Sequence, residues 1–232
     1  MSVGSFVEVP LRNALVAGIV IEIMGTTDIK RVVSINKVLS IPPFSSDDIE
    51  FYQMLARQTY QSLSSILFAS VPTLPKRMVH KARPEIPAAS FPLSVEEVET
   101  LKGLLDHVRD NNHTRVCLPN DRLGIGLVFA LLKATKDPLL VLVPDVHMAQ
   151  AVYTVARGLT DSIKFLFAKQ SNTEAYESWL ALREGTSRVI IATRKGALVP
   201  PHSSVRTVML GSGEDDFTQW EQNPHYDARW CV

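Results

Sequence analysis

The spacing of apolar residues changes near residue 90, and the pattern after that point predicts alternating strands and helices. Short runs of consecutive apolar residues alternate there with longer stretches in which apolar side chains recur at helical spacing. Continuous apolar runs are typical of strands buried on both faces, so we expect a parallel sheet with helices on both sides. The predicted strands are 115–118, 139–143, 163–167, 188–192 and 205–210, and the predicted helices are 94–108, 123–134, 146–159 and 173–183.

The pattern before residue 72 predicts a different kind of structure. Runs rich in β-branched residues are punctuated by Pro10 and by a Gly-Thr-Thr-Asp turn at 25–28. Short strands separated by proline and glycine signals indicate a small curled sheet or barrel. The predicted strands are 6–9, 14–24 and 31–39.

Two helix starts carry capping signals. Ser94 is followed three residues later by Glu97, which is the spacing of a capping box. Ser45 precedes apolar positions that keep helical spacing from Ile49 to Leu67. Tyr52 and Tyr60 both fall on that spacing, and we interpret both as core residues.

A proline-rich stretch separates the two patterns and predicts a domain boundary. We expect a first domain over 1–72, a basic linker over 73–90 and a second domain over 91–232. The basic residues of the linker either stay solvated or contact phosphate, and the sequence leaves both readings open. They are Lys76, Arg77, Lys81 and Arg83.

Composition and charge exclude several classes of protein. The 232 residues carry 24 basic and 24 acidic side chains, so a globally basic coat for nucleic acid is disfavoured. The longest apolar runs, such as 139–144, are too short to span a bilayer, and we expect a cytoplasmic protein without a membrane partner.

The sequence offers no pattern of metal ligands. Neither Cys117 nor Cys231 belongs to a CxxC pair, so we expect neither a zinc site nor a disulfide framework. Cys117 lies in an apolar run and is interpreted as a buried thiol. The six histidines lack metal-binding spacing: His80, His107, His113, His147, His202 and His225.

Several segments, in order along the chain, resemble the primosomal protein N′ family, the PriA replication-restart helicases. The most specific is 214–230, EDDFTQWEQNPHYDARW, where the family's proline, tyrosine and Ala-Arg intervals recur at Pro224, Tyr226, Ala228 and Arg229. Segments 140–150 and 177–201 resemble earlier helicase motifs. Segments 3–23 and 40–67 resemble the later part of the family's N-terminal DNA-binding domain.

The resemblance implies an α/β protein in two parts. A small β-rich, barrel-like domain ending in a helix would precede one RecA-like parallel α/β lobe. Other parts of the family do not occur among these residues: a second RecA-like lobe, a zinc-binding insertion, a winged helix and the opening strands of the first domain. The resemblance therefore does not by itself imply specific capture of a DNA 3′ end.

The chain departs from the family at the nucleotide site. Where the family has a P-loop, this sequence has Pro119 to Gly126, with Ile125 at the lysine position and Gly126 at the hydroxyl position. Gly211 and Ser212 stand at the positions of the metal-binding aspartate and the catalytic glutamate. Without a cation for the phosphates or carboxylates for magnesium, we expect neither ATP nor magnesium as a cofactor and no ATPase activity. The degenerate site comprises Pro119, Gly124, Ile125, Gly126, Gly211 and Ser212.

Two neighbouring groups could be read as replacements for the lost residues. Arg122 is more simply a surface charge at a helix start. The acidic residues 214–216 are more simply a solvated turn than a displaced metal site.

DNA contact is the chemistry that the resemblance leaves in place. Single strands bind cationic grooves lined by aromatic rings. The aromatic residues near the C-terminus either stack on bases or pack against the sheet, and Arg194 either contacts DNA or forms a structural ion pair. The DNA-binding candidates are Arg12, Lys30, Arg31, Lys37, Lys76, Arg77, Lys81, Arg83, Arg194, Phe217, Trp220, Tyr226 and Arg229.

Three functions follow as hypotheses. The first is a non-hydrolysing PriA-like protein of replication restart or primosome assembly that binds single-stranded or forked DNA and associates with restart proteins. The second is a pseudo-helicase module that binds a protein partner and has no meaningful affinity for DNA. The third is an ATP-dependent DNA helicase with a divergent nucleotide site, which the missing lysine and acidic pair disfavour.

Overall fold

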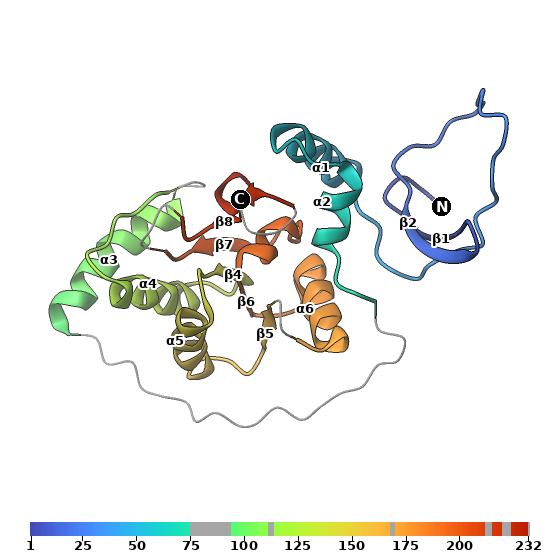
Figure 1. Cartoon of the computed structure of the whole chain (residues 1–232). Helices are drawn as coiled ribbons and strands as arrows, with labels where there is room; N and C mark the ends of the chain where they lie inside the picture. Colours follow the sequence, from blue (N-terminus) through green and yellow to red (C-terminus); the bar gives the residue numbers. More distant parts are fainter. Residues whose placement is uncertain (75–93, 111–113, 168–169, 212–214, 220–223, 232) are drawn as a thin grey trace. The chain divides into compact units, whose positions relative to one another are not determined.

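The computed structural model describes residues 1–74, 94–110, 114–167, 170–211, 215–219 and 224–231. Within the chain it separates two compact units, Met1–Ile66 and Leu67–Val232. Each unit has its own sheet (Figure 1). All but two residues of the predicted linker, 73–90, lie outside the described residues.

The first unit is built on a three-stranded antiparallel sheet. Strands β1 (Phe6–Leu11), β2 (Ala14–Ile19) and β3 (Lys37–Val38) lie in the order β2-β1-β3. A two-residue turn, Arg12-Asn13, joins β1 to β2 and sets the register in which Leu11 faces Ala14. The predicted β-rich N-terminal part is therefore confirmed.

The predicted strands 14–24 and 31–39 were too long. Residues 20–36, which we call the arm, form no strand and are exposed almost throughout. Pairing ends at Val20 because the neighbouring strand β1 offers no further partner. Phe6 pairs with Ile19, and the last backbone bonds of this ladder join Val20 to Gly4 and Ser5. Beyond Val20, β-branched residues meet no neighbouring strand, and β propensity alone does not form a sheet.

Two helices follow in place of the single helix that the apolar spacing predicts. Helix α1 (Ser46–Gln58) has the predicted cap at Ser45, and α2 (Leu63–Ser70) begins after a break. Tyr52 is buried as expected and its ring lies 5.2 Å from that of Phe44. The interpretation of Tyr60 as a core residue was wrong, because this side chain is 96% exposed.

Tyr60 is exposed because the backbone of α1 ends there. Tyr60 has a left-handed backbone with φ of 55°, and the amide of Gln61 donates to the carbonyl of Ala56 at 3.0 Å. The amide of Tyr60 itself donates to Arg57. This pair of bonds is a Schellman helix end, which usually has glycine in the left-handed position.

The second unit contains a four-stranded parallel sheet. Strands β4 (Leu139–Leu142), β5 (Ile163–Leu166), β6 (Val189–Ala192) and β7 (Arg206–Met209) lie in the order β5-β6-β4-β7. Every residue of β4 and β6 is buried, as continuous apolar runs predict. These four predicted strands and the parallel α/β fold of a RecA-like lobe are confirmed.

Helices cover the sheet, and their starts follow the sequence closely. They are α3 (Val95–Asp110), α4 (Asp121–Ala134), α5 (Val146–Arg157) and α6 (Asn172–Glu184). The predicted capping box is confirmed: Glu97 N donates to Ser94 Oγ at 3.1 Å, and Ser94 N donates to Glu97 Oε2 at 2.7 Å. Figure 1 shows α4 and α5 on one side of the strands and α6 on the other.

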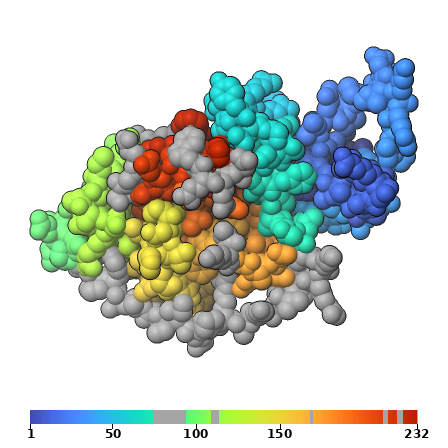
Figure 2. Space-filling view, in the orientation of Figure 1, coloured from blue at the N-terminus to red at the C-terminus, as the bar shows by residue number. Residues whose placement is uncertain are grey.

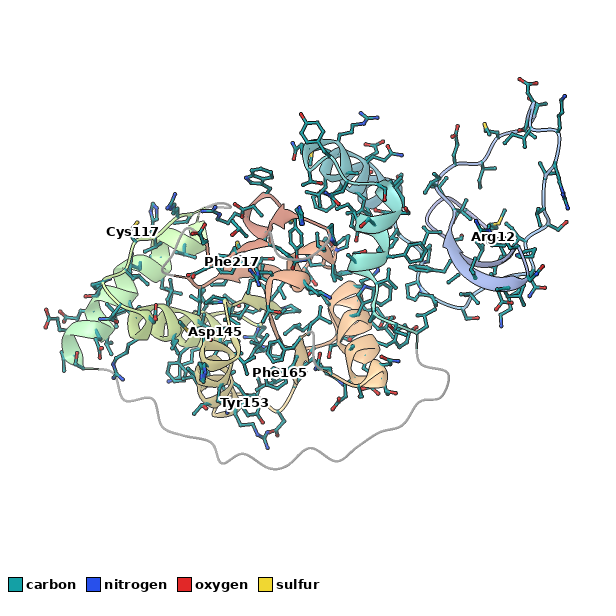
Figure 3. The ribbon with its side chains drawn as sticks, in the orientation of Figure 1. Arg12, Cys117, Asp145, Tyr153, Phe165 and Phe217 are labelled. Carbon is teal, nitrogen blue, oxygen red and sulfur yellow. The ribbon has the colours of Figure 1, made fainter. Side chains whose placement is uncertain are left out.

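The predicted strand at 115–118 was wrong. This segment is extended, and exposed Arg115 and Cys117 alternate with half-buried Val116 and Leu118. It forms no ladder with another described strand, and β7 is paired with β4 alone among the described strands. The interpretation of Cys117 as a buried thiol was wrong for the same reason, since alternation turns its side chain outward (Figure 3).

A compact C-terminal motif completes the unit. It comprises the 3-10 helix η1 (Arg194–Leu198), a short hairpin of β8 (Thr218–Gln219) and β9 (Tyr226–Asp227), and the 3-10 helix η2 (Ala228–Trp230). The amide of Ala228 donates to the carbonyl of Phe217 at 2.9 Å and extends the hairpin. Among the described residues, no helix is long and apolar enough to cross a membrane.

Candidate nucleic-acid interface

The hairpin of the first unit presents Arg12 at its tip (Figure 3). Arg12 has φ of 54°, and a positive φ at the first of two turn residues normally calls for glycine. Its side chain is exposed and takes no part in a described ion pair. An exposed guanidinium on a strained hairpin tip is well placed for a phosphate oxygen.

The other predicted cations of this unit are exposed as well. Lys37 lies on β3 opposite Glu8, whose carboxylate accepts a 2.5 Å hydrogen bond from the side-chain amide of Asn36. Lys30 and Arg31 lie on the arm. The structure thus places four candidate cations at three places of one unit: the hairpin tip, the arm and β3.

Several predicted site residues lie outside the described residues, so the structure says nothing about their surroundings. They are Lys76, Arg77, Lys81 and Arg83 of the linker, together with Ser212 and Trp220.

The two remaining aromatic candidates of the C-terminal motif are buried. Phe217 is 4% exposed and Tyr226 is 1% exposed, so a base cannot reach either ring without a rearrangement. Burial also raises the pKa of the Tyr226 phenol, whose hydroxyl finds no hydrogen-bond partner among the described residues. Of the two readings of these aromatics, packing describes Phe217 and Tyr226.

Arg194 and Arg229 are occupied within the same motif. Arg194 Nη1 donates to the backbone carbonyl of Thr218 and so joins η1 to β8. Arg229 Nε donates to Asp227 Oδ1 at 2.9 Å, and this contact holds the pKa of Asp227 below its usual range. Arg194 therefore has a structural partner, which is a carbonyl and not the carboxylate of an ion pair, while Arg229 keeps an exposed face.

The segment 119–126, which the resemblance aligns with a P-loop, forms a capped helix start. The side chain of Asn120 caps α4 by accepting the amide of Leu123 at 3.0 Å, which engages one of the free amides that a phosphate would need. Ile125 is 7% exposed and belongs to the apolar cluster between α4, α5 and the sheet. Pro119 is exposed, and Gly124 and Gly126 are buried.

Arg122, on the same turn, points to a carboxylate of the second unit. Its Nε donates to Glu97 Oε1 at 2.9 Å, an ion pair that lowers the pKa of Glu97. The guanidinium thus joins the starts of α3 and α4.

Gly211, which the resemblance aligns with the metal-binding aspartate, has no room for a side chain. A Cβ atom on Gly211 would lie 2.5 Å from Cε2 of Phe217 and 2.9 Å from Oδ2 of Asp216. Contacts below 3 Å are not tolerated against a rigid ring, so Phe217 occupies the space in which such an aspartate would begin. Nothing in the sequence spacing indicates this contact, and sequence reasoning missed it.

The described residues contain no cluster of three or more histidine, cysteine or carboxylate side chains that could hold a metal ion. Of the six histidines, His107, His147, His202 and His225 fall within the described residues, and His80 and His113 do not.

Comparison with known proteins identifies one region of the chain. Residues 1–72 match the family model of the PriA 3′DNA-binding domain (3′BD). No curated protein matches the chain.

Proposed function

We propose, from the match of residues 1–72 to the PriA 3′DNA-binding domain, that this chain is a PriA-like protein that binds single-stranded or forked DNA in replication restart or primosome assembly without hydrolysing ATP. The match to a 3′ DNA-binding domain supports DNA-binding, PriA-like function in replication restart. The kind of DNA, the residues that hold it and the lack of hydrolysis are the finer parts of the proposal.

The DNA contact surface is proposed on the first unit. Arg12 carries this assignment, because an exposed cation at a backbone position that disfavours its side chain costs stability without giving a described contact in return. Lys37 adds a second exposed cation on the same sheet. Phosphate contacts of this kind supply affinity without reading sequence, which suits a protein that recognises the form of a DNA junction.

The absence of hydrolysis is proposed from two packed sites. Ile125 contributes to the apolar core where the family has a phosphate-binding lysine, and Phe217 fills the space beside Gly211. Restoring one of these groups would leave the other missing. Their combination supports a lobe that keeps its fold and has lost its nucleotide chemistry.

The second unit has a second candidate function, as a module that binds a protein partner. The observation in its favour is that Phe217, Tyr226 and Arg194, three of its predicted DNA-contact residues, are buried or engaged inside the unit. Under this proposal the first unit binds DNA while the RecA-like lobe contacts another protein of restart. A lobe that acted as a helicase would instead turn over ATP in the presence of DNA.

A charge-neutralisation experiment tests the DNA surface. We expect Arg12→Gln combined with Lys37→Gln to weaken binding of a fluorescein-labelled fork about tenfold. The slope of log affinity against log salt concentration should become shallower by about two, which corresponds to the loss of two phosphate contacts. Lys102→Gln, an exposed cation on α3, is the matched control and should leave the affinity within about twofold. Equal losses in the two variants would contradict a surface on the first unit.

A further inference from the structure

The arm, residues 20–36, carries an unusual amount of exposed apolar surface. Val32 is 70% exposed, and six further large apolar side chains of the arm also face solvent. Figure 1 shows the arm as an open loop beyond the sheet, and Figure 2 shows it as a narrow column of atoms. The exposed apolar residues are Ile21, Ile23, Met24, Ile29, Val32, Val33 and Ile35.

Part of the arm has the sequence alternation of strands. Ile21 and Ile23 flank Glu22, Val33 and Ile35 flank Ser34, and the predicted turn at 25–28 lies between the two segments. This spacing is typical of strands with one apolar face, but neither segment is paired with another described strand. Unpaired strand-forming segments with an apolar face readily associate with a further strand.

The charges on the arm indicate which partner would cover it. Glu22 and Asp28 stand with Lys30 and Arg31, so the arm carries two charges of each sign. DNA would meet two carboxylates there, and a strongly charged protein would meet two like charges. A second copy of the arm carries both signs, so a two-fold arrangement can place acidic residues of one copy opposite basic residues of the other.

Size and net charge agree with a second copy. The surface formed by β2 and the arm, residues 14–36, falls in the range of roughly 20–30 residues a side that stable interfaces use. The formal net charge of the chain is zero, so two copies do not repel each other over long range.

We propose that the arm, together with strand β2, is the interface of a homodimer, in which arms from two copies pair through their exposed apolar side chains and exchange acid–base contacts. The Gly211 and Ile125 sites play no part in this association, and it does not depend on DNA.

A charge-exchange experiment tests this proposal. One variant carries Lys30→Glu and Arg31→Glu and has an all-acidic arm, and the other carries Glu22→Lys and Asp28→Lys and has an all-basic arm. In sedimentation velocity we expect the wild-type protein to approach twice the monomer mass and stop there as concentration rises. Each variant alone should dimerise at least tenfold more weakly, and an equimolar mixture should dimerise again.

A second pair of variants tests the apolar contact. Ile23→Glu combined with Val33→Glu should abolish the dimer, while Val95→Glu, at a 79% exposed apolar residue outside the arm, should leave it intact. Circular dichroism confirms that each variant is folded. The proposal is overturned by a wild-type monomer at every concentration, by association that grows without a plateau, by a mixture that stays monomeric or by equal effects of the arm and control variants.

Discussion

The ring of Phe217 lies where a side chain on residue 211 would start, with Cε2 2.5 Å from the position of a Cβ atom on Gly211. One substitution at residue 211 therefore cannot introduce a carboxylate unless the Phe217 ring moves. The Phe217 ring can lie here because residue 211 has no side chain, and residue 211 must remain a glycine while the ring lies here. The packing of this pair is one of the two observations that support our proposal that the RecA-like lobe does not hydrolyse ATP.

The fit of this pair predicts a non-additive pair of substitutions. Gly211→Ala should destabilise the second unit by roughly 1–3 kcal/mol, because the new methyl group overlaps the ring. In a Phe217→Ala background the same change should cost much less, since the ring has gone. Urea unfolding of the four proteins of the cycle measures the coupling, and additive costs would contradict the packing described for residue 211.

The burial of Ile125 in the apolar cluster predicts that a lysine at this position destabilises the protein. Ile125→Lys puts an ammonium group into an apolar cluster, and we expect the unfolding free energy to fall by roughly 3 kcal/mol. The loss will be smaller if the lysine side chain extends far enough for its ammonium group to reach water. No ATPase activity should appear. Ile125→Val is the matched control and should cost about 1 kcal/mol. DNA-stimulated phosphate release by the lysine variant would show that the site is still a nucleotide site.

The left-handed residue at the end of α1 predicts a stabilising change. Tyr60→Gly removes the strain of φ 55° from a side chain that is almost fully exposed, and should raise the unfolding free energy by about 0.5–1 kcal/mol. The same substitution two residues earlier, Gln58→Gly, falls at the last residue of the helix and should cost up to about 1 kcal/mol. Thermal unfolding of both variants is sufficient, and a destabilised Tyr60→Gly protein would speak against the helix end described here.

The two cysteines should react at different rates. Burial, followed by the negative charge of Asp227, raises the pKa of Cys231 to about 12, and only the thiolate is nucleophilic. Cys117 is exposed. At pH 8 we therefore expect iodoacetamide to modify Cys117 well before Cys231, and the Cys231 reaction to stay slow until the pH approaches that pKa. Mass spectrometry of Cys117→Ser and Cys231→Ser identifies each reaction, and similar rates would contradict the placement of Cys117.

The salt bridge in the C-terminal motif predicts an acid-sensitive contribution to stability. Arg229 lowers the pKa of Asp227 in the folded state, so its contribution is present above the carboxyl's unfolded pKa and is lost as the pH falls through the folded pKa. Asp227→Asn should therefore lower stability at neutral pH and flatten its fall on the acid side. Unfolding curves between neutral and strongly acidic pH compare the two proteins.

Local signals in the sequence predicted the helix starts and the buried parallel strands well. The side chains of Ser45 and Ser94 each cap a helix by bonding to the residue three positions later. The continuous apolar runs of β4 and β6 are stable only where both faces of the strand are buried. The arm and 115–118 have equally good strand patterns but have no neighbouring strand among the described residues, and pairing is not encoded locally. Tyr60 fits the apolar spacing, yet the backbone bonds of the helix end exclude it from the core.

The candidate site divides in the same way. The resemblance predicts Ile125 and Gly211 as departures from the family's nucleotide site, because neither residue offers a cation or a carboxylate. The sequence could not show that Phe217 occupies the space beside Gly211 or that Arg194 binds the carbonyl of Thr218, because both contacts depend on how the C-terminal hairpin packs.

The central claim is that this chain, whose residues 1–72 match the PriA 3′DNA-binding domain, binds DNA independently of nucleotide. An anisotropy titration of a labelled fork with the full chain, at two salt concentrations and with or without magnesium-ATP, tests it most directly. We predict saturable binding that weakens steeply with salt and is the same with and without ATP. Absence of saturable binding at low salt, or an affinity that changes with ATP, would contradict the account.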